Sequence, residues 1–111
     1  MNYNNKKFRA VSNTENGETS SDTIFHYKQT GRILTSSYKG GKILEGHLIG
    51  IVDKNGTIDM CYHQVNINGE LMTGKCISKP EILANRKIRL HETWQWTSGD
   101  NSHGHSILEE V

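Results

Sequence analysis

The sequence has few of the features that mark several classes of protein. It has a single proline, two cysteines and no basic run longer than two residues among its 111 residues. A net charge of +1, with both signs spread along the chain, lacks the electrostatic footprint of a nucleic-acid binder. No segment approaches the ~20 consecutive apolar residues of a membrane span. We therefore expect neither a nucleic acid nor a membrane as partner.

The start of the chain also lacks a targeting signal. The segment "MNYNNKKFRAV" contains no apolar stretch of the kind found in secretory signals, so we expect a cytoplasmic protein. Thiols stay reduced in that compartment. Cys61 and Cys76 are fifteen residues apart, which matches neither a zinc motif nor a CxxC motif.

Helical signals are scarce, and turn signals are frequent. The best helical candidate, "KPEILANRK" at 79–87, could equally be a loop. Eight of the eleven glycines occur in short polar segments such as "NTENGE", "KGGK", "DKNG" and "NING". Glycine, Asn and Asp are the residues that tight turns favour. The apolar share of 33% is below the usual ~45–50%, although that reference also counts glycine, so we expect a lean core.

The segments between the turns alternate between apolar and polar residues, which is typical of half-buried strands. We expect one all-β domain over residues 1–111 with about eight strands, joined consecutively as an antiparallel meander. Closure into a small up-and-down barrel would remove both exposed edges. The alternative is a curled sheet or sandwich that pairs with a second subunit. The expected strands are 6–12, 22–29, 32–39, 42–52, 57–66, 70–78, 87–97 and 105–110.

Turn lengths suggest a register and hence an interior face. Two-residue loops at 30–31 and 40–41, with Val52 opposite Thr57 and Val65 opposite Glu70, place most large apolar side chains on one face. This aromatic face, which we assign to the interior, consists of Phe25, Tyr27, Leu34, Ser36, Tyr38, Ile43, Glu45, His47, Ile49, Ile51, Ile58, Met60, Tyr62, Gln64, Leu71 and Thr73.

The opposite parity gives a smaller, more mixed strand face. We expect it outside, where it could pack against a second copy of the chain in a homo-oligomer. A single β-bulge would reverse the parity beyond it. The mixed strand face consists of Ile24, His26, Lys28, Thr35, Leu44, Gly46, Leu48, Gly50, Asp59, Cys61, His63, Met72, Gly74 and Cys76.

Polar residues on the aromatic face indicate a ligand pocket. Apolar walls with a few placed polar groups are typical of small-molecule sites. The late segment "IRLHETWQW" adds an acid and both tryptophans at one parity. An alternative is that these polar groups only satisfy one another, because buried polar groups need partners. The candidate ligand-binding residues are Tyr27, Glu45, His47, Tyr62, Gln64, Glu92, Trp94 and Trp96.

The same residues allow an enzymatic hypothesis. Burial would raise the pKa of Glu45 or Glu92, and His47 could complete an acid–base pair. These three residues are the catalytic candidates. The histidines of "HGH", at 103–105, could chelate a metal, but a site needs three or four converging ligands, and we read this segment as a polar turn. We expect no metal and no cofactor.

Five stretches carry a resemblance over nearly the whole chain: "FRAVSNTENGE", "GHLIGIVDKNG", "MCYHQVN", "GELMTGKC" and "RLHETWQWTSGD". With them the chain resembles a family of small bacterial proteins often labelled N-acetylglutamate synthase. Acetyltransferases of the GNAT type have an α/β fold and an Arg/Gln-x-x-Gly-x-Gly/Ala loop at the start of a helix. The sequence contains no such loop, so we expect no acetyltransferase activity.

The expected barrel is similar in architecture to the calycin folds, which include the lipocalins and avidins. The similarity is one of architecture alone, because the lipocalin Gly-x-Trp motif is absent. It implies a barrel that holds a small, partly apolar molecule in its interior.

Overall fold

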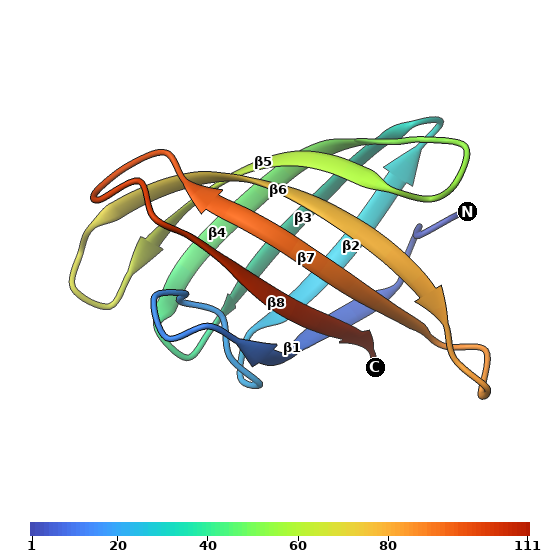
Figure 1. Ribbon diagram of the computed structural model, residues 1–111, viewed down its shortest axis with the longest axis horizontal. Coiled ribbons are helices and arrows are strands. Elements are labelled where there is room, and N and C mark those ends of the chain that lie inside the picture. The colour runs from blue at the N-terminus through green and yellow to red at the C-terminus, as the bar shows by residue number, and fades with distance from the viewer.

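The computed structural model describes residues 1–111 as eight antiparallel strands that close into one barrel in chain order. β1 pairs with β2 and also with β8, so the sheet has no free edge (Figure 1). The all-β, up-and-down barrel predicted from the sequence is confirmed. The segment at 79–87 forms the end of β6 and a turn. The strands are β1 Lys7–Asn13, β2 Ile24–Thr30, β3 Ile33–Gly40, β4 Ile43–Val52, β5 Ile58–Asn66, β6 Leu71–Ile82, β7 Ile88–Trp96 and β8 His103–Glu110.

Two of the hairpin turns use the same local chemistry. The Asp53 carboxylate accepts hydrogen bonds from the backbone N–H groups of Asn55 and Thr57, at 2.8 and 3.0 Å. The side-chain oxygen of Asn66 makes the equivalent pair of bonds in the β5–β6 turn. Each turn ends on a glycine with positive φ. Such Asx turns explain why "DKNG" and "NING" interrupt the strands.

A β-bulge in β4 overturns part of the expected interior. The pairing with β5 shifts between Ile43 and Glu45, so Leu44 and Glu45 both point outward. Beyond the bulge the inward residues have even numbers, such as Leu48, while Glu45 and His47 lie on the outer surface. The prediction that Glu45, His47, Ile49 and Ile51 face the interior is therefore wrong.

The provisional register also fails at the turns. Thr30 pairs with Ile33, so the loop is 31–32 and Tyr27 faces Ser36. In the β5–β6 hairpin, Val65 pairs with Leu71 and not with Glu70. This shift of one residue reverses the inward parity of β6. Its interior residues are Gly74, Cys76 and Ser78, and the expected inward positions of Leu71 and Thr73 are contradicted.

The mixed strand face is consequently not one surface. Its members in β2, β3 and β5, such as His26 and Cys61, are mostly outside, as expected. In β4 and β6, Leu48 and Cys76 instead point into the barrel and are 6% and 5% exposed. The prediction of a continuous outer mixed face is therefore wrong.

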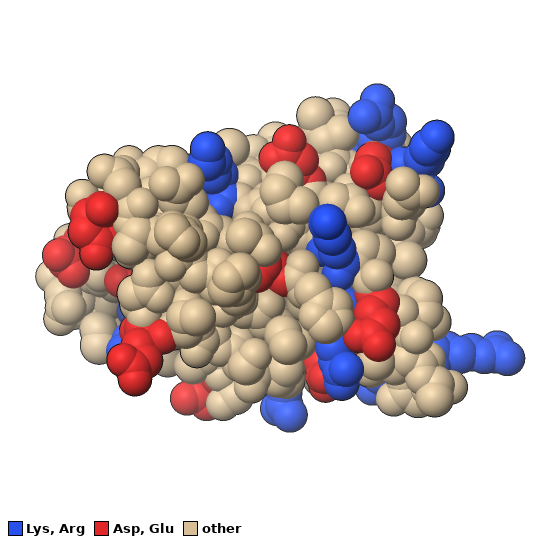
Figure 2. All heavy atoms as spheres, in the orientation of Figure 1, with Lys and Arg blue, Asp and Glu red and all other residues tan.

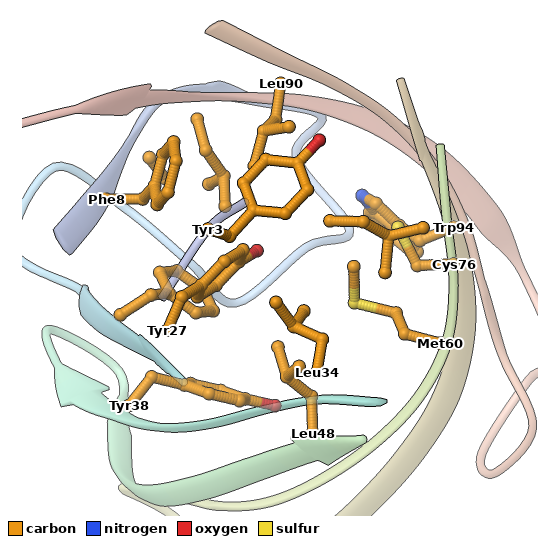
Figure 3. Close-up of a cluster of buried hydrophobic side chains, with 14 of the residues drawn as sticks. Tyr3, Phe8, Tyr27, Leu34, Tyr38, Leu48, Met60, Cys76, Leu90 and Trp94 are labelled. Atoms are coloured by element: carbon orange, nitrogen blue, oxygen red, sulfur yellow. The ribbon is translucent and has the colours of Figure 1, made fainter. Parts of the chain in front are cut away.

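One end of the barrel is filled with aromatic and aliphatic side chains. Tyr3, from the segment before β1, is fully buried and its hydroxyl donates to the backbone oxygen of Gly56. Its ring contacts those of Phe8 and Tyr27 at centroid distances of 6.3 and 6.1 Å. Figure 3 shows these three rings near Leu90, with Met60, Cys76 and Trp94 on another part of the wall. The N-terminal segment thus closes this end.

The outer surface mixes charged and apolar side chains. Basic and acidic groups are interspersed over the face that Figure 2 displays. Several isoleucines on β3 and β4 are also exposed, among them Ile33, Ile49 and Ile51 at 54, 58 and 53%. No helix of the structure has the length and apolar character needed to cross a membrane.

Candidate functional site

A cavity of about 50 Å³ lies inside the barrel, at the end opposite to Tyr3. A volume of this size holds a few water molecules. Each of the eight strands contributes at least one side chain to its walls, β1 through its last residue, Asn13. The lining residues are Asn13, Gly17, Glu18, Thr19, Phe25, Tyr38, Leu48, Met60, Tyr62, Gln64, Cys76, Glu92, Trp94, Trp96 and Ser106.

Aromatic rings form much of the wall. The Trp94 and Trp96 rings meet edge to face, with centroids 5.4 Å apart, and Tyr62 meets Trp96 in the same manner at 5.8 Å. Across the barrel, Phe25 and Tyr38 stack at 4.6 Å. These arrangements are the preferred geometries of aromatic pairs. They give the cavity rigid apolar surfaces.

A glycine makes room for one of these rings. An added Cβ at Gly74 would overlap the ring of Tyr62, its cross-strand neighbour. Gly46 stands in the same relation to Tyr38. The absence of a side chain at these two positions therefore lets both tyrosines lie flat against the barrel wall.

The long connection between β1 and β2, residues 14–23, which we call the strap, is drawn in Figure 1. Its residues Gly17, Glu18 and Thr19 line the cavity. Glu18 anchors the strap by accepting hydrogen bonds from the amides of Gln64 and Asn66, both at 2.8 Å. The Trp96 indole N–H donates to the backbone oxygen of Asn16 at 3.0 Å. Both tryptophan nitrogens are used here, because Trp94 donates to Asn13 Oδ1 at 3.2 Å.

A short chain of polar groups runs along the wall. The Tyr38 hydroxyl donates to Gln64 Oε1 at 2.8 Å, and the amide of Gln64 continues to Glu18. Burial, together with the negative charge of neighbouring acids, raises the pKa of Tyr38 and of Tyr62 well above their usual range. Both phenols are therefore neutral donors near neutral pH.

Glu92 is the carboxyl in the depth of the cavity. Burial raises its pKa to about 7, although the neighbouring hydroxyl groups of Ser106 and Ser78 favour the ionised form and act in the opposite direction. Ser106 Oγ donates to Glu92 Oε1 at 3.1 Å. No Lys, Arg or His side chain lines the cavity. The ionised carboxylate thus has no cationic partner from the protein, and such a group is costly to bury.

Five of the eight predicted ligand-binding residues line the cavity. They are Tyr62, Gln64, Glu92, Trp94 and Trp96. Tyr27 is inside the barrel, as expected, but it packs between Phe8 and Phe25 and does not line the cavity. Its hydroxyl is buried without a hydrogen-bond partner.

Glu45 and His47 are absent from the site, contrary to the sequence prediction. They contact each other on the outer surface, with Glu45 Oε2 2.9 Å from His47 Nε2. Their side chains are 73 and 51% exposed. The predicted pairing of His47 with Glu92 is contradicted too, because these residues lie on opposite sides of the barrel wall. No group of three or more His, Cys, Asp and Glu side chains has an arrangement that could hold a metal ion.

Sequence reasoning missed several residues of the site. Leu48 and Cys76 were assigned to the outer face because the bulge and the β6 register were not visible in the pattern. Glu18 and Asn13 were not considered, since contacts such as that of Glu18 with Gln64 join residues far apart in the chain. The one available signal was the length of the acidic connection "NTENGETSSD", which exceeds that of the other turns.

Comparison with known proteins agrees with the barrel. The chain matches the family described as avidin-like protein over residues 1–111. No curated protein matches it significantly. An eight-stranded up-and-down barrel with a walled interior is the calycin-type architecture of that family. The match covers the whole chain, and the protein therefore belongs to the avidin-like family.

Proposed function

We propose that this protein binds a small molecule in the cavity beneath the strap. The observation that carries the proposal is the contrast between the two ends of one barrel. At the Tyr3 end, side chains of the protein fill the barrel. At the strap end, a cavity remains whose walls are aromatic rings together with a carboxyl, an amide and hydroxyl groups. Membership of the avidin-like family supports this function.

The size of the cavity bounds the ligand. Pockets for drug-sized molecules have volumes of roughly 300–1,000 Å³, and this cavity has about 50 Å³. With the strap closed, the site accommodates only a small head group. A larger ligand would have to displace the strap or extend past it, so the strap is expected to respond to binding.

A native mass spectrum tests the proposal. The protein is measured as purified, after incubation with a metabolite extract, and after denaturation. We expect a mass above a whole number of chains that disappears on denaturation. Masses that equal whole numbers of chains in all samples would contradict the proposal.

A cavity-filled variant provides the matched control. Cys76→Leu adds apolar volume to the cavity wall and is expected to abolish the excess mass. Cys61→Leu makes the same change on the exposed outer surface of β5 and is expected to retain it. Equal retention by both variants would place the ligand elsewhere.

We also propose a second role, self-association through an outer apolar patch. Ile33 pairs with Ile51 across β3 and β4, and Ile49 lies two residues away on the same outer surface. Exposed apolar patches of this kind are typical of association surfaces. Replacing Ile51 by Lys tests it: a smaller mass in light scattering supports association, and a monomer in both forms contradicts it.

A further inference from the structure

We propose that the cavity is built for an organic cation, and that an alkylammonium or quaternary ammonium head group occupies it. This inference rests on the proposed small-molecule function and adds the chemical class of the ligand. It is carried by three features: the charge of the lining, the aromatic walls and the environment of Glu92.

All ionisable side chains that line the cavity are acids. The fifteen lining residues include two carboxyls, Glu18 and Glu92, and no basic side chain. The other titratable groups, Cys76, Tyr38 and Tyr62, are acids as well. Entry of an anion would therefore bring like charges together in a region of low dielectric, whereas a cation would be attracted.

The aromatic walls suit the same class of ligand. A cation within about 6 Å of an aromatic ring face is attracted by the ring quadrupole, and aromatic cages recognise quaternary ammonium groups in this manner. Trp94, Trp96 and Tyr62 meet edge to face in succession, and Tyr38 lines another part of the wall. Rings in several orientations surround a compact head group better than a single flat wall does.

Glu92 supplies a counter-charge that the protein leaves unpaired. Its only hydrogen bond within ordinary geometry is the one from Ser106. Ser78, its cross-strand neighbour, has a fully buried hydroxyl with no hydrogen-bond partner. A cationic head group beside Glu92 would compensate the charge of the carboxylate.

Binding of a cation is then linked to the ionisation of Glu92. The titratable groups whose pKa the charge of Glu92 raises are Cys76 of β6, and Tyr27, Tyr38 and Tyr62 of β2, β3 and β5. Glu18 of the strap lines the same cavity. Burial raises the pKa of the thiol and of the three phenols, so they stay neutral. With its pKa near 7, Glu92 changes charge in the neutral range.

The surface around the entrance of the cavity also carries mainly negative charge. The strap contains Glu15, Glu18 and Asp22 and no Lys or Arg. On the face that Figure 2 displays, charged groups are mainly acidic at the left end, where Figure 1 places the β5–β6 and β7–β8 turns. Lys39, near the end of β3, and Lys42, in the β3–β4 connection, moderate this field. Acidic groups around a cleft raise the local concentration of cations.

Three molecules of nearly equal shape and different charge test the inference. They are choline, its uncharged carbon isostere 3,3-dimethyl-1-butanol, and the anion 3,3-dimethylbutyrate. Trp94 and Trp96 are the only tryptophans of the chain and both line the cavity, so tryptophan fluorescence reports binding there. We expect choline to bind about tenfold more tightly than the neutral isostere, and the anion to bind least.

The pH dependence gives a second measurement on the wild-type protein. A site that requires ionised Glu92 with a pKa of about 7 gains about tenfold in choline affinity between pH 6 and pH 8. The affinity for the neutral isostere should not rise over this range. Both comparisons use the unaltered protein and do not depend on the folding of any variant.

Two matched variants locate the effect. Glu92→Gln is expected to remove the preference for choline and its pH dependence, while Glu45→Gln, the same change on the exposed surface, leaves both intact. Equal or weaker binding of choline than of its neutral isostere overturns the cation inference but leaves the small-molecule function standing. If none of the three molecules binds, the cation inference falls, and the native mass spectrum decides separately whether any small molecule is held.

Discussion

At the scale of single residues, the burial of Glu92 links the stability of the fold to pH. Its pKa is about 7 in the folded chain, against 4.5 for an ordinary glutamate. Between these two values the folded state binds more protons than the unfolded state. The free energy of unfolding therefore falls as pH rises from about 4.5 to 7.

The expected loss is about 2–3 kcal/mol over this interval, because one pKa unit corresponds to about 1.4 kcal/mol. Urea unfolding at pH 5 and pH 8 measures it. Glu92→Gln should remove most of the difference, and Glu45→Gln should not change it. A wild-type protein equally stable at both pH values would show that the pKa of Glu92 is not raised in the folded state.

Gly74 tests the packing of the cavity wall. In Gly74→Ala the new methyl group would overlap the Tyr62 ring, and such overpacking typically costs about 1–3 kcal/mol. The Tyr62 ring contacts Trp96, so tryptophan fluorescence should also change. In a Tyr62→Ala background most of the cost should vanish, because the two residues interact directly. Additive losses of unfolding free energy would contradict this contact.

Alternation along single strands identified much of the site. On β5 and β7, the sequence placed Tyr62, Gln64, Glu92, Trp94 and Trp96 on one face, and all five line the cavity. These strands have no bulge, so parity persists along them. The prediction from alternation failed for Glu45 and His47. One extra residue in β4 reverses which side chains of this strand point into the barrel. Single-strand patterns contain no reliable signal for such a bulge.

At the scale of structural elements, the strap is the feature that local patterns describe least well. It has no regular structure, and its position depends on contacts with distant strands. Glu18 joins the strap to Gln64 and Asn66 on β5. Hydrogen bonds to charged groups contribute roughly 1.5–3 kcal/mol. We therefore expect the two hydrogen bonds that Glu18 accepts to keep the strap closed much of the time.

Removal of the two hydrogen bonds that Glu18 accepts should open the mouth of the cavity. In Glu18→Ala we expect greater quenching of tryptophan fluorescence by acrylamide, since Trp96 lies against the strap through Asn16. The melting temperature should fall slightly. Glu15→Ala removes an exposed acid from the same strap and serves as control. Equal quenching in both variants would indicate that Glu18 does not hold the strap.

Turn chemistry predicted the elements themselves well. Gly and Asn residues separated the strands nearly where the structure does, because positive φ is needed at the hairpin ends. The same pattern could not settle register. The loop at 31–32 and the pairing of Val65 with Leu71 each differ from expectation by one residue. The second shift reverses the inward face of β6, since side chains alternate with a period of two, whereas the first leaves Leu34, Ser36 and Tyr38 inside.

At the scale of the whole molecule, the barrel followed from the number of strands and the need to remove sheet edges. Whether its interior would be full or hollow could not be read from the sequence. That depends on how eight strands combine large and small residues: Tyr3 fills one end, and Gly46 and Gly74 accommodate rings at the other. The cavity is thus a property of the assembled barrel.

The most direct test of an interior ligand site is a fluorescence titration with a set of small neutral, cationic and anionic molecules. Wild-type protein, Cys76→Leu and Cys61→Leu are compared, with Trp94 and Trp96 as the only tryptophan reporters. We expect at least one molecule to give a saturable change in the wild type and in Cys61→Leu, and none in Cys76→Leu. A saturable change that persists unaltered when the cavity is filled, or no change with any molecule, would contradict a binding site inside the barrel.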